Sequence, residues 1–280
     1  MLQDSLLAPR PPWVADALGL LARYRFLTAR QFAAVIGRGE GDVASALEGL
    51  VAEGVLQTLT PTTIALAAPK GSAFALTRAG LACIATEHVV NPHQIVRPLR
   101  SSFTLAHELL VNEFALVLHQ LDARRTLRLL SWETRRERIA DVAHLAVKGR
   151  ALRIPLVADG LAVVEHGGRK QGLLIEVDLG TVSARRMREK FAGYHAWWAE
   201  GGPVRRWGLG ALRVLTIAPA PRRLERLRDL ALEAVDGRGS GLFWFLPQMA
   251  VDVTHPEHLL ETIAFVGKAG EDERCTLFSS

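Results

Sequence analysis

The chain has 280 residues, which at roughly 150 residues per domain allows one large domain or two ordinary ones. Hydrophobic residues make up 49% of it and charged residues 22%, a composition that excludes a disordered or fibrous protein. No apolar run approaches the ~18 to 20 residues of a bilayer span, and the N-terminal stretch MLQDSLLAPRPP lacks the basic and apolar regions of a signal peptide. We therefore expect a soluble, cytoplasmic protein with no membrane contact.

The formal net charge of +5 is unevenly distributed. Residues 1–89 contain seven basic and seven acidic residues, so the whole excess lies in residues 90–280. Most of the 34 basic residues are arginines, whose planar guanidinium group binds two phosphate oxygens at once. The charge indicates nucleic acid as a partner of the second part of the chain, although an arginine bias is equally typical of a GC-rich genome.

The first part of the chain predicts a winged helix-turn-helix domain over residues 1–89. Helical spacing of apolar residues, a Thr cap and an extended polar ribbon follow one another in the expected order. The expected elements are helices over Trp13–Tyr24, 29–37, 41–53 and from Leu76, with extended segments over 54–56 and 58–66.

The third of these helices would enter the DNA major groove, yet its charges oppose that role. It carries no lysine or arginine, and its acidic residues are a poor surface for a polyanion. These residues are Glu40, Asp42, Glu48 and Glu53. Two interpretations stay open for this domain: DNA reading, or contact with a second copy or another protein.

The rest of the chain predicts an α/β sheet domain over residues 101–280, after a linker over 90–100 that contains two prolines and no periodicity. The arginine-rich segment 133–153 has no assignable structure. The expected elements are helices over 101–121, 182–198 and 221–235, and strands over 127–132, 156–164, 172–178, 212–217 and 242–246, with a turn at 167–170.

Three carboxylates interrupt the apolar strands of this domain. Glu176 and Asp178 share one face of a strand because side chains alternate at period two, and Asp159 joins that face if the two strands form a hairpin. Neither strand offers a basic partner, and an unpaired buried charge is costly. A divalent cation would resolve the repulsion, and all-oxygen ligation favours Mg²⁺ or Mn²⁺.

The helix over 182–198 presents Arg186, Lys190 and Tyr194 as one stripe. Lys190 would lie within reach of the metal and could stabilise a phosphorane or position water. Arginines near the site form a candidate DNA-binding surface. These are Arg135, Arg136, Arg138, Arg185 and Arg186.

Two residue patterns resemble known families. Ala158-Asp159 followed by Glu176-Val177-Asp178 resembles the PD-(D/E)XK nuclease signature, with the motif lysine replaced by Lys190 from the next helix. The strings LAHELLVNEF (105–114) and LLIEVDLGTVSARRMREKFAGY (173–194) are similar to the replication-relaxation family. Members combine an N-terminal winged helix with a nuclease-like domain and are associated with plasmid mobilisation and replication.

This resemblance implies a nuclease that nicks DNA at an origin of transfer or replication, with a homodimer or relaxosome-type partners bound through the winged helix. Asp159 and Glu176 would be metal ligands and Lys190 the catalytic lysine, with Asp178 a further acid at the site. From the first helix of the domain, Glu113, and less directly Glu108 and His107, would approach the metal or the phosphate. The sequence departs from the pattern at Ala158, where proline is expected, and at Asp178, where simple nucleases carry lysine. A DNA-binding accessory protein that keeps the fold without the reaction is therefore the alternative function.

Other interpretations of these residues stay open. Glu176 and Asp178 would also suit the end of a strand, where they stabilise the N-terminus of the next helix. Tyr194 suits the core better than a covalent nucleophile, and His107 suits a packing role. His255 and His258 resemble a metal pair, but Pro256 between them and the lack of a third nearby ligand weaken that prediction.

Overall fold

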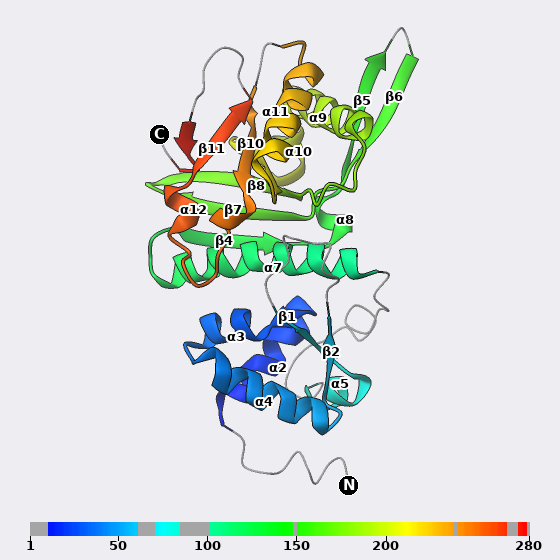
Figure 1. The fold of residues 1–280 in the computed structure, drawn as a ribbon. Helices are drawn as coiled ribbons and strands as arrows, with labels where there is room; N and C mark the ends of the chain where they lie inside the picture. The colour runs from blue at the N-terminus through cyan, green and yellow to red at the C-terminus, as the bar shows by residue number, and fades with distance from the viewer. Residues whose placement is uncertain are drawn as a thin grey trace. The chain divides into compact units, whose positions relative to one another are not determined.

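A computed structural model of the chain describes residues 11–60, 71–84, 101–147, 150–237, 240–267 and 274–278 (Figure 1). The protein has a mixed α+β fold in two compact units, Met1–Leu116 and Val117–Ser280, and the division falls inside helix α7 (Ser102–Ala123). The predicted linker over 90–100 lies outside the described residues. Among the described helices, none combines the length and the apolar character that a bilayer crossing requires.

The first unit combines short helices with a small antiparallel sheet in the order β1-β3-β2. Helices over 13–24, 29–37 and 41–53 were predicted and are present. β3 was not predicted, because a buried apolar run of four residues is too short for periodicity to distinguish a strand from a helix. The predicted ribbon lies largely outside the described residues. The elements are α2 (Trp13–Tyr24), β1 (Leu27–Thr28), α3 (Ala29–Ile36), α4 (Glu40–Ala52), β2 (Leu56–Leu59), β3 (Ala73–Leu76), α5 (Arg78–Ile84) and the first part of α7.

A capping box fixes the start of α3. Thr28 Oγ1 accepts a hydrogen bond from the Gln31 N–H at 3.3 Å, and Gln31 Oε1 accepts one from the Thr28 N–H at 2.9 Å. Gln31 Nε2 also donates to the Leu109 carbonyl of α7 at 3.1 Å. One buried side chain therefore caps α3 and holds it to α7.

The second unit is built on a seven-stranded mixed sheet with the order β12-β11-β10-β9-β8-β7-β4. β8, β9 and β10 are parallel neighbours, and the remaining pairs are antiparallel. The elements are β4 (Arg128–Glu133), α8 (Arg136–Ile139), β5 (Asp141–Val147), β6 (Arg150–Leu156), β7 (Gly160–His166), β8 (Arg169–Val177), α9 (Ala184–Ala199), α10 (Gly202–Trp207), β9 (Leu212–Ala218), α11 (Pro221–Ala234), β10 (Ser240–Pro247), the 3-10 helix η1 (Gln248–Ala250), α12 (His258–Glu261), β11 (Ile263–Gly267) and β12 (Arg274–Thr276).

Helices α9 and α11 pack side by side on one face of this sheet and enclose its main core (Figure 1). Phe191 of α9 meets Phe243 and Phe245 of β10 edge to face, with ring centroids 5.1 Å and 6.0 Å apart. This packing holds α9 rigidly over the centre of the sheet.

The unassigned segment 133–153 forms α8 and most of a separate hairpin, β5–β6, that packs against α9. Gly193 makes the approach possible, because a Cβ at this position would lie 2.8 Å from Ile154 Cγ2. Trp197 Nε1 donates to Asp141 Oδ2 at 2.8 Å and fastens the other side of the hairpin to α9.

One predicted boundary is wrong in a way that matters for function. The strand expected over 156–164 begins at Gly160, and residues 157–159 form an irregular connection between β6 and β7. Gly160 permits the close approach to Trp132, whose ring carbon Cη2 would lie 2.5 Å from a Cβ there. Asp159 therefore lies in the connection, directly before the start of β7.

Candidate active site

The C-terminal end of β8 carries the candidate site. Strand β8 lies inside the sheet, paired with β7 on one side and β9 on the other, and Glu176 is its second-last residue. The Asp159 N–H donates to the Ile175 carbonyl at 2.8 Å, and Asp159 Oδ2 accepts from the Val177 N–H at 2.8 Å. Backbone bonds thus hold the Asp159 carboxylate beside the end of β8.

Helix α9 supplies two donors to Glu176. Lys190 Nζ binds Oε2 of this carboxylate and also donates to the Val157 carbonyl at 3.0 Å. Tyr194, one turn further along α9, donates its hydroxyl to Oε1. The predicted stripe on α9 therefore faces Glu176 with two of its three residues.

Burial dominates the electrostatics of this cluster. Desolvation raises the pKa of Glu176, and the Asp159 carboxylate raises it further, while Lys190 and Tyr194 act in the opposite direction. Burial, followed by the charges of Glu176 and Asp159, raises the pKa of Tyr194 well above its ordinary value, so Tyr194 is a neutral donor. In their ionised forms Asp159 and Glu176 carry two negative charges against the one positive charge of Lys190, an imbalance that a bound cation would relieve.

The donor set suits a hard divalent cation. Asp159 is half-buried, and its charge acts on the carboxylate of Glu176. Thr216 pairs with Glu176 across the β8–β9 ladder, and within the described part of the chain its buried hydroxyl has no hydrogen-bond partner. Oxygen ligands together with a hydroxyl that can accept a bond from metal-bound water fit Mg²⁺ or Mn²⁺.

Asp178 is held apart from this cluster. Arg223 of α11 binds its Oδ2 at 2.7 Å, and the Gly180 N–H donates to Oδ1. The carboxylate is 3% exposed, so the arginine compensates a buried charge. The structure brings together two of the three predicted acids, and the third joins β8 to α11.

Sequence reasoning missed Arg223, although a signal for it exists. β8 and β9 are parallel, so their C-terminal ends meet at one edge of the sheet, and α11 begins directly after β9. A basic residue in the first turn of α11 is therefore a natural partner for an acid at the end of β8.

Glu176 and Asp178 lie at the end of strand β8, as the capping interpretation expects, but neither is the N-cap of α9. Ser183 is the N-cap of α9, and its hydroxyl accepts from the Arg186 N–H at 3.4 Å. Glu176 faces the side of α9 and not its end.

The predicted residues of α7 have partners within the first unit. Glu113, 1% exposed, binds Arg30, and its Oε2 accepts from Gln31 Nε2 at 2.7 Å. Glu108 binds Arg25 at 3.0 Å, and burial raises its pKa in spite of that arginine. The positive charge of His107 acts on Glu108 in the same direction as Arg25. These contacts join α7 to the segment from Arg25 to Gln31.

The predicted DNA-binding arginines are exposed, but their partners differ. Arg135 and Arg138 both pair with Glu133, at 2.6 Å and 3.5 Å, and Arg185 pairs with Glu189 at 2.9 Å. Arg136 and Arg186 form no ion pair with any residue that the structure describes.

The fold and this cluster define a mixed α+β protein with two acids and a lysine at the end of a central strand. The family model for replication-relaxation matches residues 18–210, more than half of the chain, and the chain belongs to that family. Membership points to a role in the replication or mobilisation of plasmids and other mobile elements, and hence to DNA. No curated protein matches the chain. The matched segment contains Asp159, Glu176 and Lys190.

Proposed function

We propose that this protein is a metal-dependent DNA endonuclease, a nickase that acts in the mobilisation or replication of a plasmid or integrative element. The convergence of Asp159, Glu176 and Lys190 carries the proposal. In this proposal the second unit is a PD-(D/E)XK nuclease-like domain. The antiparallel run β4–β7–β8, followed by α9 and the parallel strand β9, supports that assignment.

Asp159 and Glu176 would hold Mg²⁺ or Mn²⁺, which when bound activates water and neutralises charge that develops on the phosphate. Tyr194 keeps Glu176 oriented through Oε1, so that Oε2 is the oxygen available to the cation. Lys190 then turns its ammonium group from Glu176 toward the scissile phosphate while the Val157 carbonyl still anchors it. Attack by water in line with the leaving oxygen leaves free DNA ends and requires no covalent link to Tyr194.

Exposed arginines of the second unit would bind the DNA backbone. Arg136 and Arg186 form no ion pair within the described chain, so a phosphate need not displace a carboxylate from them. Arg135, Arg138 and Arg185 would have to leave Glu133 or Glu189 first, and they contribute less.

The first unit would serve as a winged helix whose partner is a second copy of the chain or a relaxosome-type protein. Helix α4 carries Glu40 and Asp42 in its first turn, where the helix dipole stabilises acids and a phosphate would be repelled. The order α2, α3, α4 and the β2–β3 pair supports the winged-helix assignment.

One observation favours the alternative, an inactive DNA-binding accessory protein. Both oxygens of Glu176 already have donors, Lys190 and Tyr194, so the cluster is also satisfied as a structural network. Such a protein would bind DNA with salt dependence but without dependence on Mg²⁺.

Nicking of supercoiled plasmid with Mg²⁺, with Mn²⁺ and with EDTA tests the proposal. We expect metal-dependent nicking by the wild type and none by Asp159→Asn or Lys190→Met. Lys170→Met is the matched control, because Lys170 is an exposed lysine near the opposite end of β8. Circular dichroism verifies that each variant is folded at the assay temperature. Nicking retained in both site variants would overturn the assignment of the site, and DNA binding without nicking by the wild type would favour the accessory protein.

A further inference from the structure

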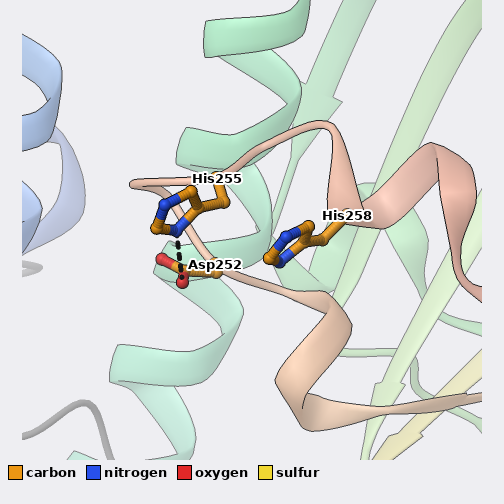
Figure 2. A group of neighbouring side chains, drawn as sticks. All are labelled: Asp252, His255 and His258. Atoms are coloured by element: carbon orange, nitrogen blue, oxygen red, sulfur yellow. Dashed lines mark hydrogen bonds and ion pairs between the residues drawn. The ribbon is translucent and has the colours of Figure 1, made fainter.

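A second cluster of metal-ligating side chains lies outside the candidate active site. Asp252, His255 and His258 occupy the segment between η1 and the first residue of α12, and Figure 2 shows their side chains grouped together. One ligand atom from each residue lies within 4.8 Å of the others. The segment lies beyond residues 18–210, the part of the chain that the family model covers.

The backbone explains why residues three apart share one side of this segment. The His255 N–H donates to the Asp252 carbonyl at 3.1 Å, and the His258 N–H donates to the His255 carbonyl at 3.1 Å. Two consecutive turns of this kind give about three residues per turn, which aligns the side chains of residues i and i+3. The three ligands are therefore aligned by turns that the backbone forms without a metal.

Apolar residues between and beside the ligands hold the segment against the protein. Val251, Val253 and Leu259 are at most 5% exposed, and Pro256 is also buried. The side chains of the ligands consequently point outward, and those of His255 and Asp252 are 58% and 27% exposed. This alternation presents the ligands to solvent on an anchored backbone.

Neighbouring polar groups orient two of the ligands. The N–H and hydroxyl of Thr254 both bind Asp252 Oδ1, at 2.9 Å and 2.6 Å, which leaves Oδ2 to face His255 Nδ1 at 3.2 Å. Glu257 does not belong to the group, because its carboxylate binds Arg124 at 2.9 Å. Thr254 thus acts on the carboxylate as outer-shell partners act on metal ligands.

We propose that Asp252, His255 and His258 bind a divalent transition-metal ion, with Zn²⁺ the expected occupant. Two imidazole nitrogens and one carboxylate oxygen form a ligand set that suits Zn²⁺ and not Mg²⁺. In a tetrahedral zinc site the ligand atoms lie about 3.4 Å apart. The ligand atoms of Asp252 and His255, 3.2 Å apart, already meet this spacing. The ligand atom of His258 lies within 4.8 Å of the other two, so it would have to move by no more than about 1.5 Å. A rotation of its exposed ring out of the stack with His255 would bring it there. Water would supply the fourth ligand.

The test is calorimetric titration of Zn²⁺ into the untagged full chain after removal of metals by chelation, with Mg²⁺ present throughout. We expect one equivalent to bind, with affinity reduced at least ~10-fold in His255→Ala, in His258→Ala and in Asp252→Asn. The matched control is His144→Ala, which removes an exposed histidine of β5 outside the cluster and should bind as the wild type does. Zn²⁺ should also raise the melting temperature of the wild type and leave that of His255→Ala unchanged.

Equal zinc affinity in the wild type and in a His255→Ala/His258→Ala double variant would overturn the proposal, as would the absence of binding by the wild type. Equal melting temperatures of the metal-free proteins establish that a loss of affinity is not a loss of fold. Asp159→Asn should retain the zinc site, and His258→Ala should retain Mg²⁺-dependent nicking, so a failure of one proposal leaves the other intact.

Discussion

Lys190 of α9 and Glu176 of β8 form an ion pair although they lie 14 positions apart in the chain. Their burial is unequal, since the side chain of Glu176 is 8% exposed and that of Lys190 is 25% exposed. The carboxylate therefore depends on its partners for compensation more than the ammonium group does, because the ammonium group can reach water. This asymmetry predicts different effects for the replacement of each partner.

Lys190→Met should lower the free energy of unfolding by about 3 kcal/mol, because it leaves the buried Glu176 carboxylate without its counter-charge. Glu176→Gln should cost less, and Glu176→Gln combined with Lys190→Met should recover part of the loss. Urea unfolding at neutral pH, followed by tryptophan fluorescence, measures all three. A double variant as unstable as the sum of the two single variants would show that the residues do not interact in solution.

Arg223→Met should destabilise the second unit by about 3 kcal/mol for the same reason, because Asp178 would be left buried and unpaired. The neighbouring Arg222 is exposed, and Arg222→Met should change the unfolding free energy by less than about 0.5 kcal/mol. Urea unfolding compares the two.

The same variant tests the separation of Asp178 from the candidate active site. At a temperature where Arg223→Met remains folded, nicking per folded molecule should stay at the wild-type level. Loss of nicking with an intact fold would indicate that Asp178 acts with Asp159 and Glu176.

The contact between Glu176 and Lys190 could be predicted because each of these two residues lies in a regular element. The apolar strand that contains Glu176 is followed in the chain by the helix that carries Lys190, so their contact requires only local geometry. Asp178 was predicted to lie on the same face as Glu176, but its partner comes from α11, after another strand. The pairing of Asp178 with Arg223 depends on the parallel arrangement of β8 and β9, and the local spacing of residues along one strand does not show it.

The regions that sequence reasoning left unassigned have weak periodicity or depend on distant contacts. The hairpin β5–β6 lies apart from the main sheet and packs against α9, and its close approach depends on Gly193, 39 positions after Ile154. Asp252 lies three positions before His255, and the sequence alone did not single it out as a neighbour of the histidine pair, because only the consecutive turns of the backbone, which Pro256 was expected to oppose, bring the three side chains together.

Thr28→Ala should destabilise α3 by about 1 kcal/mol, because the Gln31 N–H loses its acceptor at the helix start. Thr28→Ser keeps the hydroxyl and should restore most of the loss. Hydrogen exchange of the amides of α3 in the full chain measures this local effect, since exchange should accelerate about fivefold in Thr28→Ala alone. Equal exchange in both variants would mean that packing, and not the cap, holds this helix end.

Tyr24 should remain neutral in alkaline solution until the pH approaches 12. Burial raises its pKa from 10.0 to about 12, in spite of the nearby Arg23. The neutral phenol is thus favoured in the folded state, and the resulting stability is complete below pH ~10 and is lost as the pH rises toward 12. The chain has two tyrosines, so ultraviolet titration of Tyr194→Phe reports Tyr24 alone. A midpoint near pH 10 in the folded protein, equal to that in guanidinium, would contradict the burial of this hydroxyl.

DNA binding in EDTA should depend on salt through the arginines that form no ion pair in the described chain. A protein that contacts Z phosphates has a log–log salt slope of about −0.9Z, so Arg136→Ala and Arg186→Ala should each reduce the slope by about 1. Arg188→Ala is the matched control, because Arg188 lies on the same helix as Arg186 and pairs with Glu233 at 2.6 Å. Its removal should change the slope less, since a phosphate would have to displace the glutamate to gain that contact. Fluorescence anisotropy of a labelled duplex over a range of NaCl concentrations gives the slope for each variant and for the wild type. Equal reductions of the slope by Arg186→Ala and Arg188→Ala would show that pairing with a carboxylate does not decide which arginines bind DNA.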